Sequence, residues 1–387
     1  MIRYAEQEIK KDDIKSVIKV LKSKYLTTGP TIEKFEYEIN KNFNCKFSVA
    51  SNSASSSLIL ACKALGLKKN DLVWTTPITF VSTANAAIHC GANIDYVDID
   101  EKSYLLSPKH LEKKLIQSKK KNKLPKIVIP VHLSGNPCDM KNIYELSKEY
   151  NFKIIEDASH AVGSQINNHK IGNCKFSEIT VFSFHPVKII TTGEGGVACT
   201  NSKKLYLDMA SNRSHGIFRD KKDTNSKTKY WFYDQKTLGY NFRMNEIQAS
   251  LGITQLSKLR QFLKKRHQIS NFYLKSFKSL PLEFQKIEKN NISSTHLFII
   301  KMDKKLKNKF FEYMKRKKIV VNFHYIPIFL HKYFKKKKIS SYKKNFPISF
   351  DYYQSAVSIP MHTNLTKRNL NYISSTIKKF FKKNSHE

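Results

Sequence analysis

Short apolar runs alternate with segments of helical periodicity over the first 252 residues of the chain. Between the runs lie segments such as SPKHLEKKLIQ (107–117) and DMKNIYELSKEY (139–150), where apolar residues recur every three or four positions. Buried strands that alternate with helices are typical of a mainly parallel α/β sheet. The apolar runs, each predicted to be a strand, occupy residues 47–51, 71–76, 94–99, 126–133, 152–158, 178–184 and 195–200.

The rest of the chain has a different pattern. All twelve glycines lie at or before Gly252, so the tight turns that glycine permits are concentrated in the first part. A long helical pattern at 243–277 predicts a linking helix with a break near Gly252, followed by a smaller α+β region. We therefore predict a large domain over residues 1–252, and a linking helix with a smaller domain over 253–387.

Composition indicates a globular protein of the cytoplasm. The chain has 387 residues, of which 40% are hydrophobic, enough for a sizeable core. No apolar run approaches the roughly 18–20 residues of a membrane span, and the N-terminus MIRYAEQEIKK has no apolar signal segment. The six cysteines form no CxxC pair, so we expect neither a disulfide framework nor a zinc site.

A net charge of +38 raises the question of nucleic-acid binding. Residues 253–387 carry 31 basic and 6 acidic residues, a net +25, and the basic runs are KKKNK (119–123), MKRKK (314–318) and KYFKKKK (332–338). These runs contain mostly lysine rather than arginine, and no helix-turn-helix, zinc-finger or RNP aromatic signature accompanies them. We expect a solvated basic surface and no nucleic-acid partner, with attraction of an acidic partner or anionic substrate as the alternative.

Polar residues follow several predicted strands, at the sheet edge where ligands of open α/β sheets bind. The stretch ASNSASSSL (50–58) leads from a strand into a serine-rich helix start, which suits a phosphate but also simple helix capping. Glu156 and Asp157 end an apolar strand, and His160 follows. A carboxylate at that depth needs a cationic partner, either a protonated ring nitrogen of a cofactor or a lysine.

Lys188 lies in the sparsely charged run FSFHPVKIITTGEGG (182–196). Burial would lower the pKa of its amine and make it a nucleophile of the Schiff-base type, whereas the alternative is a lysine whose ammonium reaches solvent. Ser183 ends the preceding strand, and Phe80 offers an aromatic surface. A phosphate seat, a deep carboxylate, a flat apolar surface and such a lysine are together what pyridoxal 5′-phosphate requires.

Four runs carry a family resemblance: EDASHAVGS, FSFHPVKIITTGEGG, RSHG and GYNFRMNEIQASLG. They resemble the signature runs of the DegT/DnrJ/EryC1/StrS sugar-nucleotide aminotransferases, and the resemblance extends from Tyr4 to about Leu365. It implies the aspartate aminotransferase-like fold (fold type I), a pyridoxal 5′-phosphate cofactor and a homodimer with shared active sites. Relatives that act as dehydratases have histidine in place of the lysine, so Lys188 favours amino transfer.

The resemblance also implies a role for individual residues. Lys188 matches the catalytic lysine that holds the cofactor, Asp157 the partner of its ring nitrogen, and Phe80 the stacking ring. The remaining cofactor residues are His160, beside the ring oxygen, Ser53, Ala54 and Ser183 at the phosphate, and Asn241 from the partner subunit. The implied sugar-nucleotide contacts are Tyr4, Lys24, Tyr25, Leu26, Thr27, Ala54, Ser183, Asn241, His324, Tyr325, Ile326 and Pro327.

Within the family, TTPITFVSTAN, PVHLSGNPCDM, NFHYIPI and SIPMHTNL are most similar to enzymes of pseudaminic acid biosynthesis. The implied reaction moves an amino group from L-glutamate to C4 of a UDP-4-keto-6-deoxy-N-acetylhexosamine and releases 2-oxoglutarate. The alternatives are the same chemistry on another keto-sugar nucleotide, and an inactive scaffold that binds nucleic acid. Two features depart from the family pattern: the lysine-rich C-terminal region, and Ser55 and Ser56, which crowd the phosphate seat.

Overall fold

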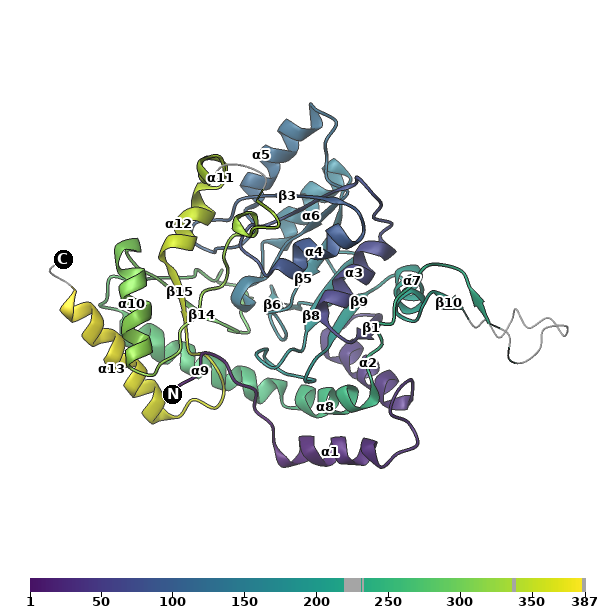
Figure 1. Ribbon diagram of the computed structural model, residues 1–387, viewed down its shortest axis with the longest axis horizontal. Helices are drawn as coiled ribbons and strands as arrows, with labels where there is room; N and C mark the ends of the chain where they lie inside the picture. Colours follow the sequence, from purple (N-terminus) through teal and green to yellow (C-terminus); the bar gives the residue numbers. More distant parts are fainter. Residues whose placement is uncertain (219–230, 232, 336–338, 385–387) are drawn as a thin grey trace.

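The computed structural model describes residues 1–218, 231, 233–335 and 339–384, so part of the basic run at 332–338 lies outside the described residues. A central sheet with helices on both faces forms the larger part, and a smaller sheet with helices lies at one side (Figure 1). All seven apolar runs form strands of the central sheet, as predicted. In spatial order they are β1 (Phe47–Ser51), β9 (Gly196–Thr200), β8 (Ile179–Ser183), β5 (Lys153–Asp157), β4 (Ile127–Ile129), β2 (Leu72–Thr75) and β3 (Asn93–Tyr96).

The central sheet is mainly parallel, as the pattern predicted. Only β9 runs antiparallel to its neighbours, β1 and β8. Because side chains alternate along a strand, each strand contributes to two separate hydrophobic cores. On β4, Ile127 and Ile129 belong to one core and Val128 to the other, and Ile155 and Ile154 of β5 divide in the same way.

Helices cover both faces of this sheet. The core that contains Ile127 is closed by α3 (Ala54–Ala64), α4 (Val81–His89) and α7 (Lys203–Arg213). The core that contains Val128 is closed by α2 (Pro30–Phe43), α5 (Pro108–Lys119), α6 (Met140–Tyr150) and α8 (Glu246–Ser257). The first helix, α1 (Lys11–Leu21), packs along α8 on the outside (Figure 1).

The smaller sheet is antiparallel, in the order β12 (Glu283–Phe284), β14 (Phe298–Lys301) and β15 (Ala356–Ile359). Its apolar side packs on α9 (Leu259–Phe277), α10 (Lys304–Arg316) and α13 (Lys367–Lys383). Two further helices, α11 (Ile339–Asn345) and α12 (Pro347–Ser355), lead back to β15. Shorter elements are β6 (Gln165–Ile166), β7 (His169–Lys170), β10 (Ile217–Phe218), β11 (Asp234–Gln235), β13 (Asn291–Ile292) and the 3-10 turns at Leu133–Gly135 and Ile328–Leu330.

The predicted break near Gly252 is wrong. Gly252 lies inside α8, where a Cβ atom would come within 2.7 Å of the Phe35 ring, so glycine is needed for close packing rather than for a bend. The helix is interrupted at Lys258, whose Nζ lies 2.7 Å from carboxylate oxygens of Asp12 and Asp13. The division of the chain into domains at residue 252 stays a prediction.

The first residues of the chain contact its C-terminal part. Ile2 donates its N–H to Lys318 and accepts one from Val320, and the carbonyl of Tyr4 accepts the N–H of Met361 at 2.9 Å. Tyr4 is thereby held beside the segment that follows β15. Among the described residues, no helix is long and apolar enough to cross a membrane.

Candidate active site

A cavity of about 580 Å³ lies at the carboxyl ends of β5 and β8, beside the first turns of α3 and α4. It brings together side chains from both ends of the chain, because the segment between α10 and the 3-10 turn at Ile328–Leu330 and the N-terminal segment both line it. The lining residues are Tyr4, Ser53, Ala54, Ser55, Leu58, Thr79, Phe80, Ser82, Val131, Asp157, Ser159, His160, Ser183, His185, Val187, Lys188, Glu194, His296, Asn322, Phe323, His324 and Tyr325.

The first turn of α3 offers free backbone donors to this cavity. The hydroxyl of Ser53 caps the helix by accepting the N–H of Ser56 at 3.2 Å. The N–H groups of Ala54 and Ser55 have no acceptor among the described residues. Gly196 permits this arrangement, because a Cβ atom there would lie 2.4 Å from the nitrogen of Ala54. Free N–H groups at the positive end of a helix form an anion-binding site, which is the phosphate seat predicted from the sequence.

Asp157 is 5% exposed and ends β5 with its carboxylate in the cavity. One oxygen accepts the hydroxyl of Thr83 at 2.7 Å, and the other accepts the N–H of Ser159 at 3.1 Å. No cation of the described chain lies at ion-pair distance from it. Glu156, by contrast, points to the opposite side of the strand, where Oε2 lies 2.9 Å from Nε2 of buried His132.

Lys188 reaches the same cavity from the loop after β8. Its neighbours in sequence Phe182, Phe184, Ile189 and Ile190 are buried. Burial lowers the pKa of Lys188 to about 8, although the Asp157 carboxylate raises it. The Nζ atom makes no hydrogen bond or ion pair within the described residues. A nucleophilic amine thus faces a carboxylate across the cavity.

His160 is buried at the wall of the cavity and neutral. Burial lowers its pKa well below the usual value, and the positive charge of Lys188 acts in the same direction. Its Nδ1 accepts the N–H of Ser134 at 3.2 Å, and its Nε2 lies 3.0 Å from the hydroxyl of Tyr325. The ring position is therefore fixed from both sides.

Four other predicted residues line the cavity as well. Phe80 precedes α4 and is 57% exposed, with its ring centroid 5.9 Å from that of Tyr325. Ser183 ends β8 and is buried. The Tyr4 and His324 rings are 5.5 Å apart, and burial together with the charge of Lys188 lowers the pKa of His324 to about 3.

The remaining predicted residues do not line the cavity of the single chain. Asn241 is exposed in the loop before α8. The segment with Lys24, Tyr25, Leu26 and Thr27 is also exposed, and it contacts the start of α8: Thr27 pairs with Asn245, and the carbonyl of Leu26 accepts the N–H of Glu246. Past Tyr325, Ile326 points to solvent and Pro327 is buried outside the cavity.

Several residues of this site were not predicted from the sequence. Thr83, which donates to Asp157, lies one turn from Thr79 in the run TTPITFVSTAN, so its spacing could have been noticed. Ser134 contributes a backbone N–H and carries no side-chain signal. His296 lies with its ring centroid 4.4 Å from that of His160, and Asn322 lines the cavity.

Known proteins resemble the chain over nearly its whole length. The sequence profile of the DegT/DnrJ/EryC1/StrS aminotransferase family matches residues 7–378. A UDP-4-amino-4,6-dideoxy-N-acetyl-beta-L-altrosamine transaminase of Campylobacter jejuni is 36% identical over 381 residues, which cover 97% of this chain and 96% of the relative. An uncharacterised protein of Methanocaldococcus jannaschii is 34% identical, with coverage of 97% and 96%.

Solved structures share the fold. An aminotransferase of Helicobacter pylori involved in the biosynthesis of pseudoaminic acid superposes with a TM-score of 0.88 and is 30% identical, with 99% of each chain covered. A sugar aminotransferase of Streptococcus pneumoniae, in its PMP form, superposes with a TM-score of 0.89 at 25% identity, covering 99% of this chain and 100% of that one. The prediction of an aspartate aminotransferase-like fold is thereby confirmed.

Proposed function

The chain belongs to the DegT/DnrJ/EryC1/StrS aminotransferase family, and on that premise we propose which reaction it catalyses. It moves the amino group of L-glutamate to C4 of a UDP-4-keto-6-deoxy-N-acetylhexosamine. The products are UDP-4-amino-4,6-dideoxy-N-acetyl-β-L-altrosamine and 2-oxoglutarate, so the ketone oxygen and the amino group change places. The observation that carries the proposal is the unpaired amine of Lys188 in one cavity with the Asp157 carboxylate and the free N–H groups of α3.

The family's cofactor is pyridoxal 5′-phosphate, and the Streptococcus pneumoniae relative was solved in both PLP and PMP forms. The cavity residues fit this group. The unpaired N–H groups of Ala54 and Ser55 suit its phosphate, and the buried carboxylate of Asp157, which has no cationic partner within the described residues, suits a protonated ring nitrogen. When bound, the cofactor accepts the electron pair left at the donor's α-carbon and stores the amino group between the two half-reactions.

Lys188 has two tasks in this proposal. Its amine would hold the cofactor covalently, which the pKa of about 8 favours because about a tenth of the amine is uncharged at pH 7, far more than for an ordinary lysine. Once released, the same amine takes the proton from the α-carbon of L-glutamate and later returns a proton to C4 of the sugar. Asp157 keeps the ring nitrogen protonated, while Thr83 and Ser159 hold its carboxylate in place.

The sugar nucleotide enters from the side of Tyr4, His324 and Tyr325. These residues come from the two ends of the chain and face Phe80 and Lys188 across the cavity. The neutral His324 is fixed by Ser358, whose hydroxyl lies 2.9 Å from its Nδ1. Aromatic rings with hydroxyl and imidazole groups suit recognition of a hydroxylated sugar ring.

A homodimer with shared sites completes the proposal. Asn241 points to solvent in the single chain, and we assign it to the phosphate seat of the partner subunit. Residues 24–27 pair with the start of α8 only four residues after Asn241, so they lie on the same surface. We therefore propose that Lys24, Tyr25, Leu26 and Thr27 contact the nucleotide together with Asn241, while Ile326 and Pro327 shape the loop beside it.

The same proposal places the enzyme in the cytoplasm. All six cysteines are free thiols, and five of them are buried. Unpaired cysteines suit a reducing compartment.

A coupled assay tests the function. The purified protein, incubated with 2-oxoglutarate and UDP-4-amino-4,6-dideoxy-N-acetyl-β-L-altrosamine, should form glutamate in the reverse direction, and Lys188→Ala should form none. If glutamate converts the bound cofactor to its amino form but no UDP-ketosugar converts it back, the proposed substrate is contradicted. The cofactor assignment would still hold. If instead a keto-sugar nucleotide with another base, or with its ketone at another carbon, takes up the amino group, the alternative substrate is supported.

A further inference from the structure

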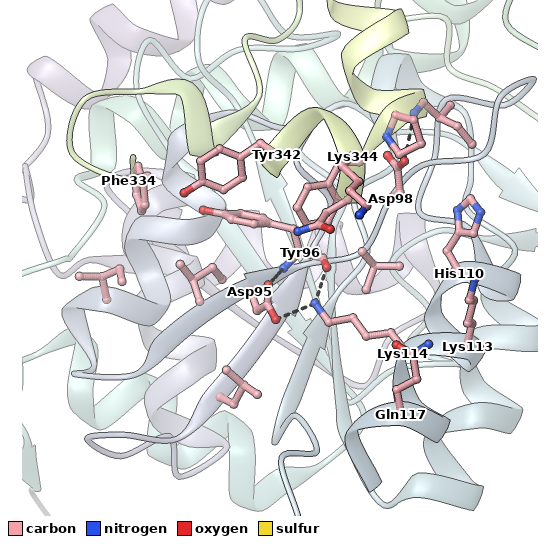
Figure 2. Close-up of a pocket in the computed structure, with 18 of the residues that line it drawn as sticks. Asp95, Tyr96, Asp98, His110, Lys113, Lys114, Gln117, Phe334, Tyr342 and Lys344 are labelled. Atoms are coloured by element: carbon pink, nitrogen blue, oxygen red, sulfur yellow. Dashed lines mark hydrogen bonds and ion pairs between the residues drawn. The ribbon is translucent and has the colours of Figure 1, made fainter. Parts of the chain in front are cut away.

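A second and larger cavity, of about 1060 Å³, lies at the other edge of the central sheet, where β3 is the last strand. Figure 2 shows residues of α5 on one side of it and the segment around α11 on the other. It is lined by Leu72, Ile88, Ile94, Asp95, Tyr96, Val97, Asp98, His110, Lys113, Lys114, Gln117, Tyr333, Phe334, Tyr342, Lys344, Asn345, Phe346, Pro347 and Ile348.

This cavity is separate from the active-site cavity. The two have no lining residue in common. An aromatic cluster backs the second cavity: the buried Phe329 ring stacks on Tyr342 at 4.5 Å and meets Tyr96 at 5.7 Å, and both of these tyrosines line the cavity. A ligand of the second cavity therefore binds outside the machinery of amino transfer.

The acidic residues of the cavity are already compensated. Asp95 forms an ion pair with Lys114, whose Nζ lies 2.7 Å from its carboxylate (Figure 2). Asp98 accepts the N–H groups of Ile348 and Ser349 at 3.1 and 3.0 Å, so it caps the start of α12. Neither carboxylate is left to attract a cation.

The basic residues, in contrast, are in excess. Lys113 on α5 and Lys344 on α11 make no hydrogen bond or ion pair within the part of the chain that the structure describes. The Nδ1 atom of His110, on the same wall as Lys113, is buried and lacks a hydrogen-bond partner among the described residues. Two unpaired ammonium groups and an unsatisfied imidazole nitrogen favour an anion with several oxygen atoms.

The wall opposite α5 is aromatic and apolar. Phe334 and Tyr342 lie there (Figure 2), and Phe346 stacks on the same Phe329 ring as Tyr342. Ile88 and Ile94 also line the cavity and add aliphatic surface. Aromatic rings beside a basic wall suit a ligand that has a flat ring at one end and phosphate at the other. We infer that this cavity binds a nucleoside diphosphate, with the phosphates at Lys113 and Lys344 and the base at the aromatic wall.

The chain provides its own reporter for this binding. It contains two tryptophans, Trp74 and Trp231. Trp74 is buried, and the Nζ of Lys114, a residue of the cavity, lies 4.5 Å from the centre of its ring. In a Trp231→Phe protein, a ligand that attracts Lys114 should change the emission of Trp74 alone.

The experiment titrates the Trp231→Phe protein with ADP, pyrophosphate and adenosine and follows Trp74 emission. A Lys113→Glu/Lys344→Glu pair reverses the two unpaired charges. The matched control is Lys109→Glu/Lys343→Glu, which changes the same charges on the same two helices at exposed residues that do not line the cavity. Thermal unfolding of each protein confirms that it is folded.

The inference predicts saturable binding of ADP that weakens at least about tenfold in the Lys113→Glu/Lys344→Glu protein and is unchanged in the control. Pyrophosphate and adenosine should each bind at least about tenfold more weakly than ADP, because each offers only half of the ligand. Absence of a saturable change, equal affinity in the two double variants, or pyrophosphate binding as tightly as ADP would each overturn it.

Discussion

The Nε2 atom of His160 lies 3.0 Å from the hydroxyl oxygen of Tyr325, 165 residues further along the chain. The backbone N–H of Ser134 can only donate, so Nδ1 of His160 carries no proton and Nε2 does. His160 therefore donates to Tyr325, and the hydroxyl hydrogen of Tyr325 is left to donate into the cavity. Burial and the nearby Asp157 carboxylate raise the pKa of Tyr325, which keeps that hydrogen in place.

We predict that Tyr325→Phe slows the sugar-nucleotide half-reaction about tenfold, the cost of one lost hydrogen bond of about 1–1.5 kcal/mol. The glutamate half-reaction should change much less, since the ring and its packing remain. Single-turnover absorbance measurements separate the two half-reactions. Tyr372→Phe, which removes an exposed hydroxyl from α13, is the control. Equal slowing of both half-reactions would contradict a contact with the sugar nucleotide.

Capture of the cofactor by the apo-protein should depend on pH through Lys188. Only the uncharged amine attacks an aldehyde, and it is present above the pKa. With a pKa of about 8 instead of 10.5, the capture rate should rise up to about pH 8 and then level off. Stopped-flow absorbance over a pH series measures this.

An ordinary lysine would give a rate that still rises above pH 9, which would contradict the lowered pKa. Borohydride reduction followed by peptide mapping should place the label on Lys188. A label on another lysine would refute the assignment. Lys188→Ala, with its fold checked by circular dichroism, is the control for non-specific labelling.

We predict that Glu156 contributes to the stability of the protein and Asp157 to its turnover. Glu156 is paired with His132 and accepts the hydroxyl of Thr180 at 2.9 Å, all inside the protein. Glu156→Gln should therefore reduce the free energy of unfolding by about 3 kcal/mol, the cost of breaking a buried pair, with little change in turnover. Asp157→Asn should do the reverse, with a loss of turnover of about 100-fold or more. Urea unfolding and steady-state rates measure the two effects.

The stability difference between wild type and Glu156→Gln should also depend on pH. The pKa of Glu156 is lowered despite its burial, chiefly by His132, so its contribution is lost as the pH falls below 4.5. The backbone N–H of Cys138 donates to Nδ1 of His132 at 3.0 Å, so that nitrogen carries no proton and Nε2 donates to Glu156. The stability difference should therefore be complete above about pH 4.5 and shrink below it. A difference that stays constant down to low pH would argue against a charged Glu156.

The local pattern of hydrophobic and polar residues predicted most of the fold. Strands such as β4 and β5 are apolar on both faces, and that pattern predicted a covered parallel sheet. The pattern was misleading at Gly252, where glycine suggested a helix break. Glycine is needed there because the Phe35 ring, more than 200 residues earlier in the chain, leaves no room for a side chain. The actual interruption is at Lys258, whose side chain pairs with Asp12 and Asp13, a contact that no local pattern could reveal.

The site residues that could be predicted are those at the ends of strands, because the order of strands in the sheet fixes their positions. Asp157 and Ser183 end adjacent strands, so their meeting in one cavity follows from the order of the sheet. Ser134 and His296 could not be predicted in this way, since one acts through its backbone and the other comes from the loop before β14, far along the chain. Asn241 lies outside the cavity of one chain, and the role that we propose for it requires a second copy.

Mixing two inactive variants tests whether a second subunit contributes Asn241 to the active site. If Asn241 completes the partner's phosphate seat, a dimer of one Lys188→Ala and one Asn241→Ala subunit has one site with both residues intact. Random exchange of equal amounts should then restore about one quarter of the wild-type activity, since half of the dimers are mixed and each has one intact site. Lys188→Ala mixed with Asp157→Asn is the matched control: these residues line the cavity of the same chain, so no site regains both. Recovery in the control, or none with Asn241→Ala once exchange is confirmed, would contradict a shared site.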